Sequence, residues 1–155
     1  MTTTGDPKAI VEALAAHEET LSAVYTAYAG AYPDVAALWR TMAAEEYVHG
    51  KLLRSMLDRD EDLKAYVDAR RFDLAEIQAE TARLRNFAQI AGSAGLSMQD
   101  AFRSAMRFEG SLIESEALTS TEHDTPEMAA VLDTLKEQTE RHKRRLTESL
   151  SSYRR

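Results

Sequence analysis

A short polar pattern inside an amphipathic segment occurs twice in this chain and decides the expected fold. The first copy is AEEYVH at residues 44–49, and the second is EQTERH at residues 137–142. Each copy follows a segment in which one glutamate lies in an apolar helical stripe, Glu18 before the first copy and Glu109 before the second. These glutamates are 91 residues apart, and the histidines that end the two copies are 93 apart, which indicates two related helical hairpins.

Cap and turn residues divide the chain into five expected helices. The cap signals are Asp6 before Pro7, Asp73, Ser97 before Asp100, and Thr125 before Pro126, and a short turn surrounds Pro33. The expected helices span residues 7–28, 35–57, 73–91, 97–120 and 126–149. They form a hairpin at 7–57, a crossover at 58–96 with one extra helix, and a hairpin at 97–150. This order predicts an all-α, ferritin-like antiparallel four-helix bundle in a single domain, 1–155.

The glutamates and histidines lie in the middle of these stripes, with apolar residues on both sides along each helix. A buried carboxylate without a partner costs several kcal/mol or gives up its charge. Residues three apart share one helix face, so Glu-x-x-His can offer a carboxylate and an imidazole to one ion. We therefore predict a metal site in the core, since these ligands suit iron, manganese or zinc. The expected ligands of one or two ions are Glu18, Glu46, His49, Glu109 and His142.

The alternative interpretation is that one or more stripes are wrongly phased. The same residues would then face water and pair with Lys51 or Arg40. Next to the expected ligands, His17 is expected to face outward. Leu112 and Glu116 are expected to continue the buried stripe of the fourth helix.

The second copy departs from the first at Thr139, which stands where a glutamate is expected. Four carboxylates balance two divalent ions, and three leave an excess of positive charge. Either a hydroxide or substrate anion then completes the site, or only one ion binds well. Glu116 is about 10 Å along the helix from Glu109, which predicts a place outside the ligand set. Glu140 points about 100° away from Thr139 and is also a poor replacement.

The chain resembles the rubrerythrin-like branch of the ferritin superfamily. Residues 13–25 resemble that family's first helix, including a tyrosine seven residues after the ligand glutamate. Residues 38–49 resemble its second helix, 106–109 its third and 135–142 its fourth. The family often has a further glutamate where this chain has Leu112.

The resemblance implies a role for each expected ligand. Glu18 and His49 would be terminal ligands of one metal, Glu109 and His142 of the other, and Glu46 a bridge. Tyr25 would hydrogen-bond a ligand carboxylate, although it fits equally as an ordinary core tyrosine.

The activity that the resemblance implies is an iron-dependent oxidoreductase that reduces peroxide or dioxygen. One alternative is a ferroxidase or iron-storage-related protein. A second alternative is a bundle whose metal site is degenerate and which serves as a binding or structural module, and Thr139 favours it. A homodimer or higher homo-oligomer is expected from fold analogy.

Composition excludes several other classes. The 155 residues include no cysteine, which excludes disulfides, cysteine zinc sites, iron–sulfur clusters and a rubredoxin-like centre. The net charge of -7 and the pI near 5.1 disfavour nucleic acid as a partner. No apolar run approaches the roughly 20 residues that span a membrane. Met1–Asp6 lacks the basic and apolar regions of a secretory signal, so a cytoplasmic location is expected.

Overall fold

The computed structural model describes residues 5–153, and the ordered elements among them are all helical. The prediction of no secretory signal concerns a segment of which residues 1–4 lie outside this range. The α-helices are α1 (Pro7–Ala31), α2 (Ala36–Arg54), α3 (Asp60–Asp68), α4 (Leu74–Ile90), α5 (Met98–Glu109), α6 (Leu112–Leu118) and α7 (Pro126–Tyr153). Short 3-10 helices at Pro33–Val35 and Ser55–Asp58 flank α2. In the described range, no helix is long and apolar enough to cross a membrane.

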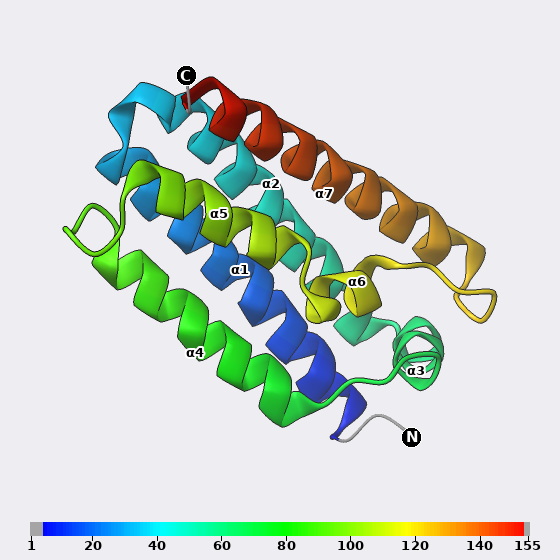
Figure 1. Ribbon diagram of the computed structural model, residues 1–155. Helices are drawn as coiled ribbons and strands as arrows, with labels where there is room; N and C mark the ends of the chain where they lie inside the picture. Colours follow the sequence, from blue (N-terminus) through cyan, green and yellow to red (C-terminus); the bar gives the residue numbers. More distant parts are fainter. Residues whose placement is uncertain (1–4, 154–155) are drawn as a thin grey trace.

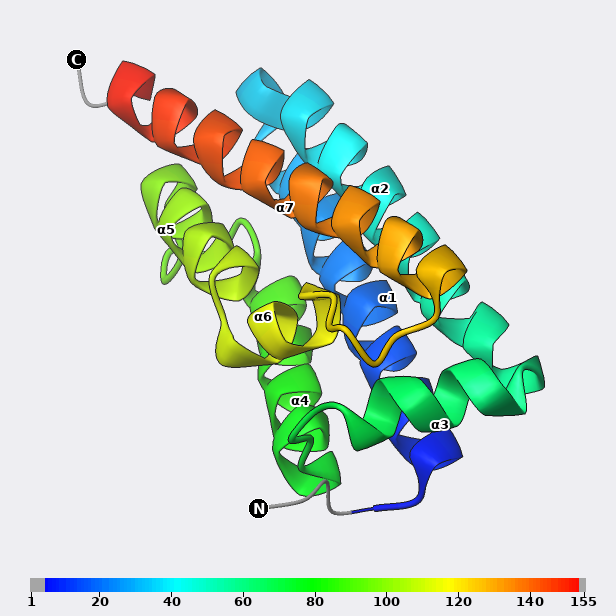
Figure 2. The ribbon, with the colours of Figure 1, turned by 90° about the vertical axis from the view of Figure 1, so that its right-hand side faces the viewer.

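The long helices pack side by side as a bundle (Figure 1). α1 packs against α2 and α4, and α7 packs against α5 and α2. The tight turn between α1 and α2 makes them antiparallel neighbours. Figure 2 shows the short helix α6 beyond the C-terminal end of α5, and α3 across the end of the bundle where α1 begins. The predicted helical bundle is therefore present in its coarse outline.

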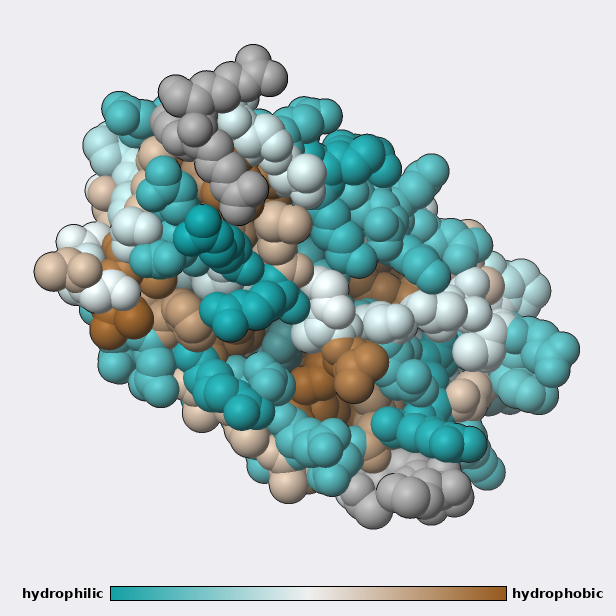
Figure 3. Space-filling view, in the orientation of Figure 1, coloured by the Kyte–Doolittle hydropathy of each residue, from teal (hydrophilic) through white to brown (hydrophobic). Residues whose placement is uncertain are grey.

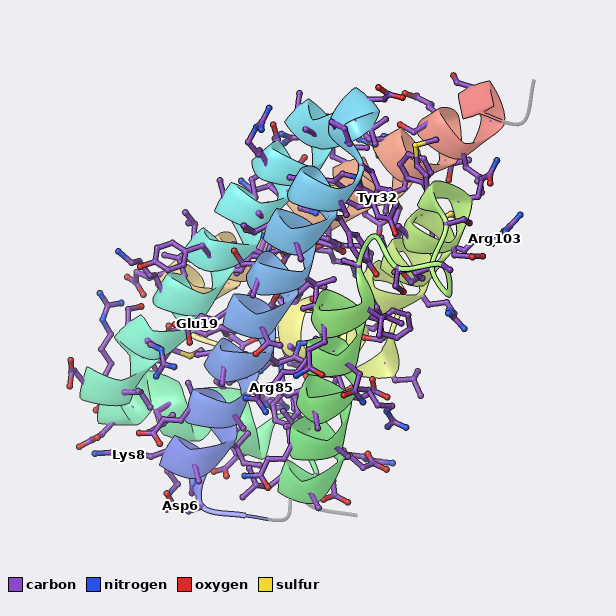
Figure 4. The ribbon with its side chains drawn as sticks, turned by 90° about the vertical axis from the view of Figure 1, so that its left-hand side faces the viewer. Asp6, Lys8, Glu19, Tyr32, Arg85 and Arg103 are labelled. Carbon is purple, nitrogen blue, oxygen red and sulfur yellow. The ribbon has the colours of Figure 1, made fainter. Side chains whose placement is uncertain are left out.

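The predicted caps account for where the helices begin. The Asp6 carboxylate accepts a hydrogen bond from the backbone N–H of the residue three positions on, and the Asp73 carboxylate caps α4 by accepting from the N–H two positions on. Ser97 and Asp100 form a reciprocal capping box at α5. Figure 4 shows Asp6 at the start of α1 and Tyr32 at its far end. There the Tyr32 hydroxyl donates to the Leu96 carbonyl and ties the α1–α2 turn to the α4–α5 loop.

The crossover contains a helix that the sequence interpretation missed. α3 lies in the charged stretch 58–71, to which the sequence interpretation assigned no helix, so the crossover carries two helices instead of one. Asp60, Glu61 and Asp62 occupy its first turn, where acidic residues favour the helix dipole. Leu63 and Tyr66 are buried on its inner face. The high charge of the segment hid a short amphipathic pattern.

The expected helix over residues 97–120 is wrong at its centre. Gly110 and Ser111 interrupt it and divide it into α5 and α6. Glycine is unfavourable inside a helix, and Ser111 caps the new one by accepting from the Glu114 N–H at 3.2 Å. The interruption changes which residues face the core. Leu112, expected to be buried, is 87% exposed, and Figure 3 shows hydrophobic surface around α6.

Two hydrophobic clusters fill the interior on either side of a polar layer. The first cluster includes Leu14, Leu53, Tyr66, Ile77, Leu132 and Leu135. The second includes Leu21, Tyr25, Trp39, Phe102 and Leu146. The buried glutamates and histidines lie between the two, at the middle of the long helices. The apolar clusters therefore hold the polar layer away from solvent at both ends.

A buried ion pair joins the crossover to the loop before α7. The Arg70 guanidinium donates to both carboxylate oxygens of Asp124, at 2.9 and 2.7 Å. Both side chains are almost fully buried. Burial opposes ionisation of Asp124, but hydrogen bonds from Arg70 and Thr121 outweigh it and lower the pKa of the carboxyl below its ordinary value of 3.8. The pair therefore stabilises the folded chain at neutral pH.

Replacing Asp124 with asparagine should lower the free energy of unfolding by about 2–4 kcal/mol, because it leaves the Arg70 charge buried. Since the folded-state pKa of Asp124 is lowered, its contribution is present above pH 4 and is lost as the pH falls through that lowered value. Urea unfolding of both proteins over roughly pH 3 to pH 7 checks this prediction. Asp68→Asn, an exposed change on α3, is the control. Equal effects of the two variants would contradict the prediction.

Candidate metal centre

All five predicted ligands are buried and converge on the polar layer. Each of them is at most 1% exposed. Glu18, Glu46 and His49 place one ligand atom each within 4.8 Å of the others. Glu46, Glu109 and His142 do the same, so Glu46 belongs to both groups. The alternative in which these side chains face water is therefore wrong.

The Glu46 carboxylate lies between the two imidazoles. Its Oε2 is 3.3 Å from His49 Nδ1, and its Oε1 is 3.3 Å from His142 Nδ1. The two imidazole rings are nearly parallel, with an interplanar angle of 16° and centroids 6.4 Å apart. One carboxylate thus presents each oxygen to a different histidine. This is the placement that a bridging ligand between two ions would have.

The outer nitrogen of each imidazole has an oxygen partner. His49 Nε2 lies 2.8 Å from the Gln138 side-chain oxygen on α7. His142 Nε2 makes a close contact with the Glu45 carboxylate on α2. At His49 an acceptor at Nε2 places the ring proton there, which turns the Nδ1 lone pair toward Glu46. At His142 the Nδ1 atom lies 3.2 Å from Glu109 Oε1. Sequence reasoning missed both partners, although Glu45 and Gln138 stand inside the two quoted patterns.

Tyr25 makes the hydrogen bond that was predicted for it. Its hydroxyl donates to Glu109 Oε1 at 2.8 Å, and its ring stacks on Trp39 with centroids 5.6 Å apart. Burial, and then the negative charges of Glu109 and Glu46, raise the pKa of Tyr25 well above its ordinary value. The phenol therefore stays protonated and holds the Glu109 carboxylate in place from the apolar side.

A fourth buried carboxylate and a third buried histidine complete the cluster, and the sequence interpretation missed both. Glu114 is 2% exposed and His17 is 3% exposed. The two form a third group of potential ligands with Glu18. The expectation that His17 faces outward is wrong, because α4 and α6 cover that side of α1. The sequence does contain a signal for this arrangement. Gly110 can end one helix, and Ser111 followed by Glu114 can begin another, which turns Glu114 toward the core.

Glu116 does not take the place predicted for it in the buried stripe. The break before α6 turns its side chain away from the cluster, and its Oε1 accepts from the Arg71 N–H at 2.9 Å. Glu140 is exposed, as expected from its angle to Thr139. Of Glu114, Glu116 and Glu140, only Glu114 lies in the cluster.

Many of the cluster's polar atoms have no hydrogen-bond partner in the described part of the chain. They are Glu18 Oε2, both oxygens of Glu46, His49 Nδ1, Glu109 Oε2 and both oxygens of Glu114. Buried polar atoms normally have partners, and a buried charge without one is costly. Because these atoms belong to neighbouring side chains of one cluster, a cation among them would satisfy them together. The buried glutamates and histidines could therefore hold a metal ion.

Burial in the cluster disfavours the charged forms of these carboxyls and imidazoles, and their pKa values are shifted accordingly. Burial is the main cause at Glu18 and Glu114 and raises the pKa of both carboxyls well above the ordinary value. Burial and the charge of Glu109 raise the pKa of Glu46 to about 8. Burial lowers the pKa of His17 to about 4. At His142 burial opposes protonation, but Glu109 and Glu46 outweigh it and raise the pKa.

A cavity of about 130 Å³ adjoins the cluster on the side of α6 and α7. Buried Glu109, Glu114 and Thr139 form its inner wall, and Lys136 and Lys143 lie among its outer residues. The Thr139 hydroxyl donates to the Leu135 carbonyl of its own helix at 3.1 Å, so it is turned away from the cluster. A side chain longer than threonine at position 139 would extend into this cavity.

Comparisons of the chain with models of protein families, with curated proteins and with solved structures give no match. The function is therefore inferred from the geometry and chemistry of the cluster.

Proposed function

We propose that this protein is a ferritin-like, rubrerythrin-related metalloprotein that binds iron in the cluster and reduces peroxide or dioxygen. The observation that carries the proposal is the set of buried glutamate and histidine atoms without partners, with Glu46 between two inward-facing imidazole nitrogens. Manganese and zinc suit the same ligands. The cytoplasmic location and the homo-oligomer expected from the sequence remain predictions.

The charges of the cluster fit two divalent ions. Glu18, Glu46, Glu109 and Glu114 supply four negative charges when ionised, which balances two such ions. Thr139 therefore leaves no deficit of carboxylates over the whole cluster, because Glu114 supplies the fourth from a different helix. This supports a working metal site over a degenerate one that has become a structural module.

Two ferrous ions would supply the two electrons that, with two protons, reduce hydrogen peroxide to two waters, and an external reductant would restore them. The chain's own residues prepare the site for this chemistry. Gln138 and Glu45 orient the imidazoles, and Tyr25 orients Glu109. The apolar clusters above and below exclude water, which strengthens each charge interaction inside.

Metal analysis of protein loaded with ferrous iron under anaerobic conditions tests the proposal. We expect about two ions per chain, as in carboxylate-bridged bundles. Stopped-flow oxidation of the loaded protein by hydrogen peroxide and by dioxygen should then show faster reaction with peroxide. Oxidation by dioxygen with accumulation of ferric mineral would favour the ferroxidase alternative. No iron after loading would overturn the proposal and favour the structural module.

Replacing Gln138 with alanine should weaken iron binding roughly 10- to 100-fold, because His49 loses the acceptor that fixes its ring proton. Competitive titration against a metal-binding dye measures this change. Gln99→Ala, a substitution on α5 outside the cluster, is a matched amide control. Equal affinities for all three proteins would show that the contact between Gln138 and His49 does not orient the ligand.

A further inference from the structure

A second pocket lies between α4 and the end of α5, the two helices that flank α1 on one side of the bundle (Figure 1). Its volume is about 260 Å³. His17 of α1 and Leu84 of α4, which are 3% and 1% exposed, are its most buried lining residues and form its floor. None of the four cluster carboxylates lines it. The proposed metal site therefore leaves this pocket without a role.

Two aromatic rings from different helices meet in the wall of the pocket. Phe87 of α4 and Phe108 of α5 lie edge to face, with ring centroids 5.1 Å apart and an interplanar angle of 76°. Both side chains are half-buried, so part of each ring is open to the pocket. A further ring packs favourably against such a pair, either edge to face or offset. The interior of the pocket therefore suits a flat, apolar group.

The rim of the pocket carries an excess of positive charge. It includes Arg83 and Arg107, and Glu80 is the one acidic residue that lines the pocket in the described chain. Glu80 pairs with Arg83 at 2.7 Å. Arg107 is exposed and has no ion-pair partner among residues 5–153, whereas Arg103, one turn earlier on α5, pairs with Asp100. A guanidinium in this position can bind a carboxylate through two parallel N–H donors.

We infer that this pocket binds a small aromatic carboxylate, with its ring against Phe87 and Phe108 and its carboxylate on Arg107. A water molecule fills about 30 Å³ of liquid, so a pocket of about 260 Å³ has room for about nine non-hydrogen atoms. This is the size of benzoate. The pocket thus matches the ligand in volume, in the apolar character of its wall and in the charge of its rim.

The ligand does not reach the metal cluster. The His17 ring lines the pocket, and its Nδ1 lies 3.7 Å from Glu114 Oε1 on the cluster side. The imidazole therefore separates the pocket from the buried carboxylates. Binding of the aromatic carboxylate should be independent of metal, and the inference does not rest on the proposed function.

Benzoate is the probe, and it is titrated into the full-length protein with and without added zinc while backbone amide NMR shifts are recorded. We expect a dissociation constant of about 0.1–1 mM in both cases, which is an ordinary affinity for a ligand of this size. The shifted amides should lie in α4 and at the end of α5. Benzamide keeps the shape and lacks the charge, and cyclohexanecarboxylate keeps the charge and lacks the flat ring. Benzamide should bind at least about fivefold more weakly, and cyclohexanecarboxylate roughly two- to tenfold more weakly.

Two substitutions test the named contacts. Arg107→Met keeps the apolar stem and removes the charge, and it should weaken benzoate binding at least about fivefold. Phe87→Leu keeps an apolar side chain and removes the ring, and it should weaken binding roughly two- to tenfold. Arg85→Met is the matched control, because Arg85 is an exposed arginine of α4 that lines a different hollow (Figure 4). Its affinity for benzoate should equal that of the parent protein. Because Arg107 is exposed, its replacement leaves the fold intact even if Phe87→Leu lowers the Tm.

Four results would overturn the inference. They are a dissociation constant for benzoate above about 10 mM, equal binding of either comparison compound, unchanged binding by Arg107→Met, and binding that appears only with zinc. Each of these would leave the proposed function as it stands. A failure of the protein to take up iron would remove the proposed function and leave the aromatic carboxylate site unaffected.

Discussion

Replacing Glu46 with glutamine should abolish the stabilisation of this protein by metal. Glu46 is the residue shared by two groups of potential ligands, and neither of its buried oxygens has a hydrogen-bond partner in the described chain. A ligand at about 1,000 times its dissociation constant adds about 4 kcal/mol to the free energy of unfolding. For a domain of this size, that corresponds to a rise in Tm of roughly 10 °C. The Glu46→Gln protein should show almost none of this metal-dependent rise in Tm.

The metal-free form of the same variant should be at least as stable as the metal-free parent. An amide of the same shape removes the cost of burying an ionisable carboxyl beside Glu18 and Glu109, and such replacements of buried ionisable groups are often neutral or stabilising. Calorimetric melting with and without zinc, which is redox-inert, measures both effects. Glu137→Gln removes one charge from the exposed face of α7 and is the control. A Glu46→Gln protein that zinc still stabilises fully would refute the central position of this carboxylate.

Replacing Glu114 with glutamine should lower the metal content from about two ions per chain to about one. The variant leaves three carboxylates in the cluster, which do not balance two divalent ions. The affinity for the second ion should fall roughly 10- to 100-fold, the usual effect of losing an interaction with a charged group. Metal analysis after dialysis and a zinc titration by calorimetry measure stoichiometry and affinity in the same protein.

Glu116→Gln is the matched control for this prediction, because both glutamates are on α6. The Glu116 carboxylate accepts from the Arg71 backbone outside the cluster. Its loss should change the free energy of unfolding by about 1 kcal/mol and leave the stoichiometry unchanged. If the two variants lost metal equally, or if only Glu116→Gln lost it, the assignment of the fourth carboxylate to Glu114 would be wrong.

Local signals in the chain were sufficient for most helix boundaries. Asp6, Asp73, Ser97 and Thr125 cap the helices that they were expected to cap, because capping depends only on a few neighbouring residues. The apolar stripes were sufficient to bring Glu18, Glu46, His49, Glu109 and His142 into the core. A polar residue in such a stripe shares the direction of its apolar neighbours, whatever the rest of the fold does.

The predicted helices were wrong where two local signals, the apolar period and the capping or charged residues, favoured different structures. The apolar residues after Gly110 continue the helical period, which favoured one long helix over residues 97–120. The capping preference of Ser111 and the low helix propensity of Gly110 outweigh that period in the structure. α3 was missed for a related reason, since its charged residues lie on the solvent face and outnumber the buried Leu63, Tyr66 and Val67.

The sequence by itself determined where the long helices α1, α2, α4 and α7 lie and which five polar side chains enter the core, because both depend on residues close together in the chain. Only the tertiary structure decided that Glu114 and His17 join them, that Glu45 and Gln138 orient the imidazoles, and that a cavity remains beside Thr139. These contacts join helices far apart in the chain. The contacts of Glu45 and Gln138 depend on how α2 packs against α7, and the contact between Glu114 and His17 depends on how α6 lies against α1, and no periodicity within a single helix records either.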